Sequence, residues 1–407
     1  MNHTHTHIQA VMKPGVSFAT LSLLVLIALQ SNPAHAIPQW ARQYNVSCNQ
    51  CHVQPPKLNQ FGGEFLANNY QWPDSTRRQE TRRTFPFAVW ASGRSDSPLS
   101  GAEHDAVRAY INRLEIISGG KAVVPWLAYF VEWRPVSFEG RNDGSLRDRS
   151  GRFEDIYLTA QRDNLEITAG QFRQVQQVDV SRRLGISEPL VLSAGLPGSD
   201  QGLTRNAEGK LSAADARVLS LRGFAPSGRS PAVRAAWNSQ LSEGLSWTAA
   251  VALPIPGEFS VPLTREARTE ASNEVEWDPK GVFVESFLRR GPATLGGHVF
   301  YDHSDRYLAN AVTTGNRAAL HWTAMAGMAK SADALRGRWS LEGEYIPSYF
   351  VALGGRVEDR AGDGAGPAFL PYINAHFPGT KSTIRLTVER RFQKGRNGTF
   401  IELGTIF

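Results

Sequence analysis

The chain has 407 residues, of which 41% are hydrophobic, and carries a formal net charge of +6 at pH 7. So mild a charge on so long a chain gives no reason to expect a nucleic-acid partner. Only 2 cysteines are present, which excludes a wider disulfide framework.

Residues 1–36 have the layout of a secretory signal peptide. Lys13 precedes an almost unbroken apolar run over residues 16–29, and Ala34 and Ala36 are small residues at the two positions that a signal peptidase reads. The run is shorter than the roughly 20 residues that cross a bilayer, so we expect a cleaved signal rather than a membrane span. The mature chain is then expected to begin near Ile37, outside the cytoplasm.

Both cysteines lie in the run Cys48-Asn49-Gln50-Cys51-His52. The spacing C-x-x-C-H is the attachment sequence of a c-type haem, in which each thiol bonds one vinyl group and the histidine ligates the iron. A thioredoxin-like pair would need a surrounding βαβ pattern, and a zinc site would need a second Cys or His pair. The sequence therefore predicts one covalent haem c on Cys48 and Cys51, with His52 as the proximal iron ligand.

The haem segment and its linker span residues 37–83, too short a stretch to bury a haem in a core of its own. His52 is its only histidine, Lys57 its only lysine, and it has no methionine. The sixth iron position is therefore either empty or filled by water, by Lys57 or by a residue from a later part of the chain. Pro55 and Pro56 each offer a backbone carbonyl to the His52 ring N–H, the kind of contact that orients a ligand.

The basic run over residues 77–83 joins this segment to the rest of the chain. It is interpreted as a solvated linker. The alternative is a patch that attracts an acidic electron acceptor.

Residues 84–407 are expected to form an all-β domain. Stretches of about ten residues alternate between apolar and polar side chains, as in 165–172, 339–345 and 384–389. A soluble sandwich gives the same alternation, so other features decide. The polar members include Glu342, Glu344, Arg385 and Glu389, which suit a hydrated lumen.

Two further features favour an outer-membrane barrel. Aromatic residues gather near the ends of the expected strands, as in a membrane-interface girdle: Trp126, Trp133, Trp277, Trp322, Trp339 and Tyr345. The last strand alternates and ends on Phe407, which resembles the assembly signal of outer-membrane barrels.

About sixteen strands are expected, an even number that leaves an aqueous channel. The expected starts are Thr84, Ala106, Ala122, Phe153, Asn164, Arg217, Ala232, Gly244, Gly281, Ala293, Arg317, Arg336, Tyr349, Ala368, Ser382 and Gly398. Residues 139–151 and 358–366 are expected as long external loops. Residues 174–211 are expected to fold inward and narrow the lumen, with a long external loop as the alternative.

Several later side chains are candidates for the sixth iron position: Met325, Met328, His298, His303, His321 and His376. We interpret the methionines as packing or lipid-facing residues and the histidines as ordinary lumen or surface residues.

The haem segment resembles the N-terminus of the monohaem cytochrome–porin fusions, whose best-known members are outer-membrane iron oxidases of Fe(II)-oxidising bacteria. The resemblance rests on residues 41–52, 56–62, Phe65 and Tyr70, and weaker likeness extends to 224–229 and 344–349. Asn69 departs from the glycine expected before Tyr70. No iron ligand is affected by this difference.

The resemblance implies an oxidoreductase-like barrel whose haem segment plugs the lumen. It would carry electrons from an extracellular donor such as Fe(II) to a soluble periplasmic cytochrome. An even strand number puts both ends of the chain on the periplasmic side. The haem segment is therefore expected to insert into the barrel from there. Two alternatives remain: a porin for small anions whose haem is structural or regulatory, and a soluble periplasmic cytochrome fused to a β-domain.

Overall fold

The computed structural model describes most of the chain from Gln39 to Ile406. The described residues are 39–44, 46–72, 87–97, 108–124, 126–140, 146–173, 183–193, 229–255, 259, 261, 281–302, 307–331, 334–361, 366–378, 383–395 and 397–406. The expected signal peptide, the basic run, Trp277, His303 and Phe407 lie outside them.

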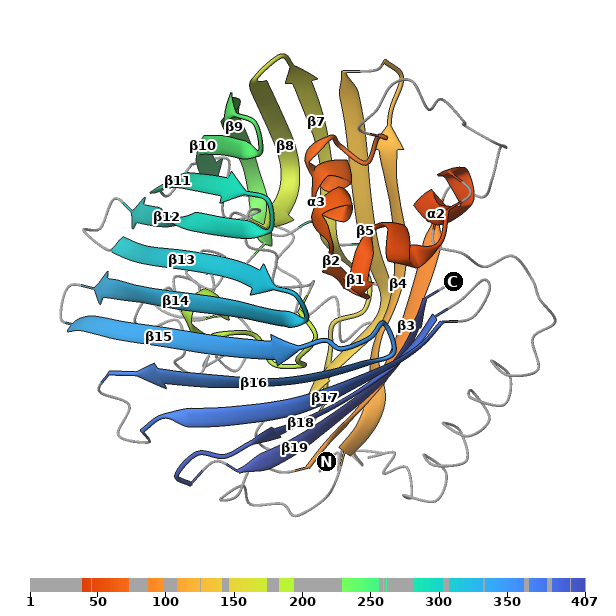
Figure 1. Ribbon diagram of the computed structural model, residues 1–407, viewed down its shortest axis with the longest axis vertical. Coiled ribbons are helices and arrows are strands. Elements are labelled where there is room, and N and C mark those ends of the chain that lie inside the picture. Colours follow the sequence, from red (N-terminus) through yellow and green to blue (C-terminus); the bar gives the residue numbers. More distant parts are fainter. Residues whose placement is uncertain are drawn as a thin grey trace, which may run out of the picture.

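Sixteen long strands of the described residues close into one antiparallel barrel (Figure 1). They are β3 (Ala88–Asp96), β4 (Arg108–Lys121), β5 (Leu127–Gly140), β7 (Arg152–Arg162), β8 (Leu165–Arg173), β9 (Arg229–Ser242), β10 (Leu245–Pro254), β11 (Gly281–Arg290), β12 (Ala293–Asp302), β13 (Tyr307–Arg317), β14 (Leu320–Ser331), β15 (Ala334–Tyr345), β16 (Val351–Arg360), β17 (Ala368–Pro378), β18 (Thr383–Arg391) and β19 (Gly398–Ile406). The short β6 (Leu146–Asp148) pairs only with the end of β5. The predicted all-β barrel is confirmed.

The barrel closes where its last strand pairs with its first, with Ile406 opposite Trp90 and Phe400 opposite Asp96. The start of β3 and the end of β19 therefore lie at the same mouth. Short connections such as 163–164, 291–292 and 318–319 turn at this end as well. We call it the short-turn mouth.

The alternation seen in the sequence corresponds to the two faces of the wall. On β15, Leu341 and Tyr345 are about half exposed on the outside, whereas Glu342 and Glu344 are buried on the inside. The same arrangement holds along β18, whereas the inner face of β11 carries Phe283 and Phe287 beside Glu285. Apolar residues outside and charged residues inside are the reverse of a soluble domain.

Two expected strand positions differ from the structure. β13 was missed because its buried inner positions include the apolar Leu308 and Val312, while its outer neighbours Ala309 and Ala311 are small. No clear amphipathic alternation results. The candidate at Arg217 lies outside the described residues, and β8 pairs directly with β9 in the wall.

The two loops expected over residues 139–151 and 358–366 are shorter in the structure than predicted. β5 continues to Gly140, and β6 pairs back onto it. β16 continues to Arg360 because Glu358 points inward, where the Arg356 Nε lies 2.9 Å from its carboxylate.

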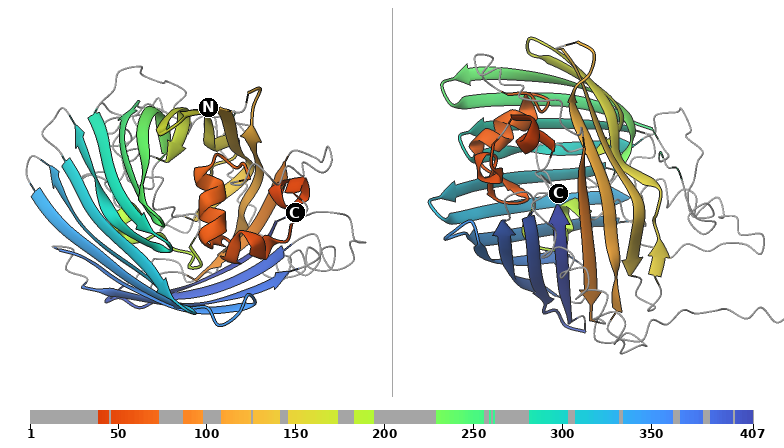
Figure 2. Two further views of the ribbon diagram at one scale, coloured as in Figure 1. Left: turned by 45° about the horizontal axis from the view of Figure 1, so that its top comes forward. Right: turned by 90° about the vertical axis from the view of Figure 1, so that its right-hand side faces the viewer.

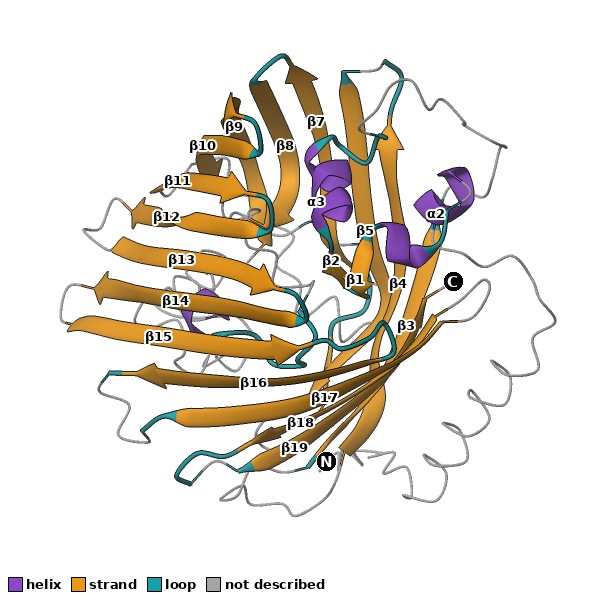
Figure 3. Cartoon of the chain, viewed as in Figure 1, coloured by secondary structure: helices purple, strands orange, loops and turns teal. Residues whose placement is uncertain are grey.

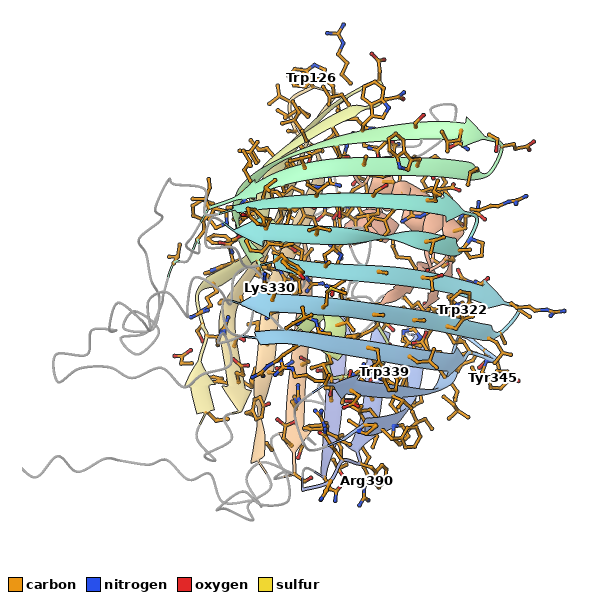
Figure 4. All side chains as sticks on the ribbon, turned by 90° about the vertical axis from the view of Figure 1, so that its left-hand side faces the viewer. Trp126, Trp322, Lys330, Trp339, Tyr345 and Arg390 are labelled. Carbon is orange, nitrogen blue, oxygen red and sulfur yellow. The ribbon has the colours of Figure 1, made fainter. Side chains whose placement is uncertain are left out.

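The expected aromatic girdle is found in part. Trp126, Trp322 and Tyr345 are 43% to 56% exposed and lie at or next to strand ends (Figure 4). Trp339 is also exposed on the outside but lies in the middle of β15 rather than at its end. Trp133 instead packs against Phe153.

The haem segment folds into short elements inside the short-turn mouth (Figure 2). They are α2 (Gln39–Tyr44), the 3-10 helix η1 (Cys48–Gln50), β1 (His52–Gln54), β2 (Lys57–Leu58) and α3 (Gln60–Ala67). The segment was expected to be helical, and the small β1–β2 hairpin is an addition to that prediction. A cis peptide bond joins Pro55 and Pro56.

A second insert lies within the lumen. Residues 183–193, which we call the inner loop, follow β8 and contain α4 (Leu190–Ser193), seen among the strands in Figure 3. α4 packs against β14, β15 and β16. Where it is described, the stretch expected to fold inward does so. No helix among the described residues is long and apolar enough to cross a membrane.

Candidate functional site

The C-x-x-C-H motif forms a tight turn that Asn59 braces. The Cys51 amide donates to the Cys48 carbonyl oxygen at 3.2 Å, which closes η1. The Asn59 side-chain amide donates to the carbonyl oxygens of Asn49 and Gln50, at 3.1 and 3.0 Å. Its side-chain oxygen accepts from the Gly62 amide and so caps α3. Asn59 thus fixes the motif to the following helix.

Gly62 allows α3 to approach the motif closely. A Cβ at this position would overlap the Cys51 carbonyl oxygen and meet the Leu58 side chain at 2.9 Å. Asn59 and Gly62 were not predicted from the sequence for this role. The pattern that could have predicted it is an asparagine, shortly after the motif, followed three residues later by a glycine.

His52 is oriented by a backbone carbonyl. Its Nδ1 lies 3.2 Å from the carbonyl oxygen of Pro56. Because a carbonyl oxygen only accepts, Nδ1 carries the proton, and Nε2 holds the lone pair that ligates a metal. One of the two prolines proposed for this contact is therefore confirmed in it.

The sulfur atoms lie in surroundings that favour an uncharged form. Burial, and to a lesser degree the neighbouring Cys48, raises the pKa of the Cys51 thiol to about 11. Burial likewise raises the pKa of the Cys48 thiol. Neither cysteine forms a disulfide. Two half-buried sulfurs that disfavour charge, beside an oriented histidine, fit a covalently attached haem, because thioether sulfur is neutral.

Lys57, one candidate for the sixth iron position, is held elsewhere. Its ammonium group pairs with the carboxylate of Glu344, whose side chain is 4% exposed. Glu344 also accepts a hydrogen bond from the Tyr372 hydroxyl at 2.8 Å. His321 on β14 is the cross-strand partner of Glu344 and so lies beside this pair.

The other candidates are scattered. His376 packs edge-on against Tyr349, with ring centroids 4.7 Å apart. His298 lies 2.8 Å from the Asn310 side chain. Met325 belongs to an apolar cluster inside the barrel, and Met328 is 45% exposed on the outside. Met325 thus packs inside and Met328 faces outward, in agreement with their interpretation as packing or lipid-facing residues.

Stacked aromatic rings attach the haem segment to the barrel wall. Trp40 stacks on Tyr70 at 4.7 Å and Tyr70 on Phe130 at 5.0 Å, while Phe130 stacks on Tyr157 at 5.5 Å. We call these four residues the aromatic stack. It joins α2 and the end of the haem segment to β5 and β7.

Asn69, where a glycine was expected, fits the same region. Its φ of 54° is left-handed, a conformation that glycine adopts freely and asparagine tolerates better than most residues. The Asn69 side chain also donates to Gln161 at 2.6 Å. The departure preserves the turn and adds a contact to the wall.

The inner loop is held chiefly by charged groups. The Glu389 carboxylate accepts from the Ile186 amide at 2.7 Å, and Glu358 accepts from the Leu190 amide at 2.9 Å. Arg356, fully buried, donates to the Ser187 carbonyl oxygen at 3.0 Å. Beyond these bonds, the loop packs into an apolar cluster: Val191, Leu192, Ala252, Phe283, Phe287, Phe300, Leu308, Val312, Met325 and Ala329.

The two inserts meet beside the haem motif. Leu184 of the inner loop packs with Ile346, Ala352 and Tyr372 of the wall, and Val53 packs against this cluster. Val53 directly follows His52. The inner loop therefore reaches the residue next to the predicted iron ligand.

The rest of the inner wall is lined with paired charges. Examples are Arg134 with Glu154 at 2.7 Å, Arg234 with Glu166 at 2.9 Å and Arg385 with Glu402 at 2.8 Å. The described residues contain no cluster of three or more His, Cys, Asp or Glu side chains able to hold a metal ion.

No protein-family model and no curated protein sequence matches the chain. Solved porin structures are similar in fold. The OmpF of Salmonella typhi, in complex with daunomycin, is 10% identical with a TM-score of 0.46, covering 79% of this chain and 97% of its own. OprB of Pseudomonas putida, at low pH, is 10% identical with a TM-score of 0.41, covering 79% and 92%. A loop-deletion mutant of OmpT from Vibrio cholerae is 10% identical with a TM-score of 0.39, covering 79% and 97%.

Proposed function

We propose that this protein is an outer-membrane cytochrome–porin that carries electrons through one covalently bound haem. The observation that carries the proposal is the C-x-x-C-H turn inside the short-turn mouth, with His52 oriented by the Pro56 carbonyl. When bound, a haem c supplies a one-electron redox centre between an extracellular donor, Fe(II) being our first candidate, and a soluble periplasmic cytochrome.

The residues of the chain have separate tasks in this proposal. Cys48 and Cys51 hold the group covalently, and His52 presents Nε2 to the iron. Asn59 keeps the two cysteines at the spacing of the turn. The barrel wall and the inner loop cover one side of the motif through Val53, while Asn49 and Gln50 stay exposed, because a segment of this size is too small to enclose a haem alone.

The outer face supports a place in the outer membrane. Large apolar side chains are exposed around the barrel, among them Val251, Leu253, Val284, Leu295, Val299, Leu341, Leu353 and Ile373. An exposed apolar belt of this extent marks a lipid or protein contact rather than a soluble surface. We infer that the short-turn mouth faces the periplasm, which lets a partner cytochrome approach the haem segment.

The second candidate is a porin for small anions with a structural or regulatory haem. The closed barrel with charged inner walls favours this candidate directly, because the same architecture serves porins without any redox group. The two lumen inserts argue against a wide open channel.

An anaerobic optical titration tests the proposal. Protein produced with haem, purified in detergent, is mixed with Fe(II) and then with dithionite. Sharp reduced bands after Fe(II) support electron transfer from iron. Reduction by dithionite alone removes Fe(II) as the donor, and the absence of a covalent haem contradicts the proposal itself.

Single-channel recording separates the two candidates. Electron transfer through a plugged barrel predicts little ion current, whereas the porin candidate predicts a steady anion current. If the protein is instead found in the soluble periplasmic fraction, both outer-membrane candidates fail.

A further inference from the structure

A groove lies on the outer face of the barrel near the short-turn mouth, and the proposed function makes no use of it. It has a volume of about 430 Å³, in the range of pockets that hold small ligands. Residues of β9 to β12 line it: Leu241, Trp247, Ser286, Leu288, Leu295 and Gly296. The three leucines are 39% to 60% exposed, so the groove opens to the surroundings of the barrel and not to the lumen.

The groove lies at the depth of the aromatic girdle. Trp247 and Trp322 are each the third residue of a strand that follows a two-residue turn, at 243–244 and at 318–319. Figure 4 looks onto this face of the barrel, with Trp322 and Tyr345 near the short-turn mouth. Aromatic residues of such a girdle lie where lipid headgroups meet the acyl chains. A lipid at this depth has its headgroup toward the mouth and its chain along the strands.

The inside of the groove is apolar because its polar groups bond to each other. The Trp247 indole N–H donates to the Ser286 hydroxyl at 3.0 Å, which ties the ring to β11. Trp322 is placed differently, since its ring covers Gly315, where a Cβ would meet it at 2.6 Å. With its polar groups bonded, the surface beside Trp247 suits a hydrocarbon chain better than a polar ligand.

A cation lies at the mouth end of the groove. Arg290 is the last residue of β11, two residues after Leu288, so both side chains point outward. Arg290 is exposed, and no ion pair joins it to another of the described residues. The nearest turn, 243–244, carries the exposed Glu243, and its Gly244 carbonyl oxygen accepts from the Gly291 amide at 3.3 Å. An exposed guanidinium at headgroup depth matches a phosphate.

We propose that the groove binds one anionic phospholipid, with an acyl chain along Leu288 and Leu295 and the headgroup phosphate against Arg290. The inference rests on the outer-membrane part of the proposed function and is independent of the haem. A second copy of the chain is a poorer occupant. A stable protein interface uses roughly 20–30 residues on each side, far more than line the groove.

The test uses the full-length protein in detergent and phosphatidylglycerol that carries a photoactivatable diazirine on one acyl chain. Mass spectrometry of the peptides locates the label, and a titration gives the apparent affinity. Arg290→Ala removes the cation. Arg317→Ala is its matched control, since Arg317 is the exposed last residue of β13. Leu295→Trp narrows the groove, and Leu341→Trp adds the same ring on β15, where Leu341 is 53% exposed.

We expect most of the label on residues 241–247 and 286–296. Arg290→Ala should weaken binding about fivefold, the effect of one cation next to anionic lipid, while Arg317→Ala should match the wild type. Leu295→Trp should lower labelling of the two segments several-fold, and Leu341→Trp should leave it unchanged. A phosphatidylcholine probe with the same chains should bind the wild type more weakly than phosphatidylglycerol does.

Label spread evenly over the outer face overturns the inference, because lipid would then only surround the barrel. Equal affinities of Arg290→Ala and Arg317→Ala also overturn it. Protection of the two segments that grows with protein concentration would show an interface between copies of the chain instead. The absence of covalent haem would refute the proposed electron transfer and would not alter this test, so the two proposals fail separately.

Discussion

The two inserts in the lumen are attached by different physical means. The haem segment packs against the wall through stacked aromatic rings, and its Lys57 forms an ion pair with Glu344. The inner loop is bound by buried charged side chains of the wall, among which Arg356 donates both to Glu358 and to the Ser187 carbonyl oxygen of the loop. Aromatic stacking fixes a ring face and is insensitive to salt, whereas a buried charge is costly to leave without its partner. The barrel thus holds the haem segment chiefly by aromatic packing, and the inner loop by buried charges as well as by the apolar contacts of Val191 and Leu192.

The largest effect is expected from removing the two cysteines, which only the haem segment carries and the inner loop lacks. Cys48→Ala with Cys51→Ala should abolish covalent haem, because no other cysteine can form the thioethers. Haem staining on a denaturing gel measures this, with Asn49→Ala as the control that keeps both sulfurs. The barrel should still fold. Covalent haem in the double variant would contradict the assignment of the site.

Arg356→Ala should release the inner loop. Removing one member of a buried charge network costs about 3–5 kcal/mol, and here it takes from Glu358 its nearest cation and from the Ser187 carbonyl oxygen its donor Arg356. Amide exchange over residues 184–192 should rise by about a hundredfold or more, as such an opening energy requires. Arg390→Ala is the control, since Arg390 is exposed on β18, two strands away from the β16 that carries Arg356. Unchanged exchange would show that the apolar contacts of Val191 and Leu192 suffice.

Tyr70→Ala should loosen the haem segment while the inner loop stays in place. Losing a ring between Trp40 and Phe130 costs about 3 kcal/mol, by analogy with other aromatic truncations. Exchange over residues 39–44 and 60–70 should rise, and added salt should change it little. Trp322→Ala, an outward aromatic 43% exposed, is the control. A strong salt dependence would mean that charge, not stacking, holds the segment.

The smallest effect is expected from Lys57→Ala. Its ammonium group is occupied by Glu344, so the haem absorption spectrum should not change. Loss of this partly exposed pair should weaken docking by about 1 kcal/mol. Glu344→Gln keeps a hydrogen-bond acceptor for Tyr372 and serves as the comparison. A new spectrum in Lys57→Ala would identify Lys57 as the sixth iron ligand after all.

Much of the fold could be read from local patterns. The strands β8, β15 and β18 were located because their outer residues are apolar and their inner residues polar. β13 was missed because apolar side chains point inward there, toward the inner loop. The total of sixteen was right although the individual strands were not all right. The strand ends near Gly140 and Arg360 were misplaced because pairing with a neighbour extends a strand past its charged residues.

The sequence by itself determined the class of the fold and predicted the chemistry of the candidate site. A five-residue motif needs no tertiary context to predict two thioethers and one ligand, and alternation with period two specifies which face of a strand is apolar. The tertiary structure decided what surrounds the motif. Asn59 bonds to the motif itself, whereas Tyr349 and Glu344 contact Gln54 and Lys57, just after the motif, from positions almost three hundred residues further along the chain. Such contacts depend on the closure and register of the barrel, which no local pattern encodes. The alternation of a single strand is compatible with pairing to many other strands, and the choice is fixed only when all sixteen pair.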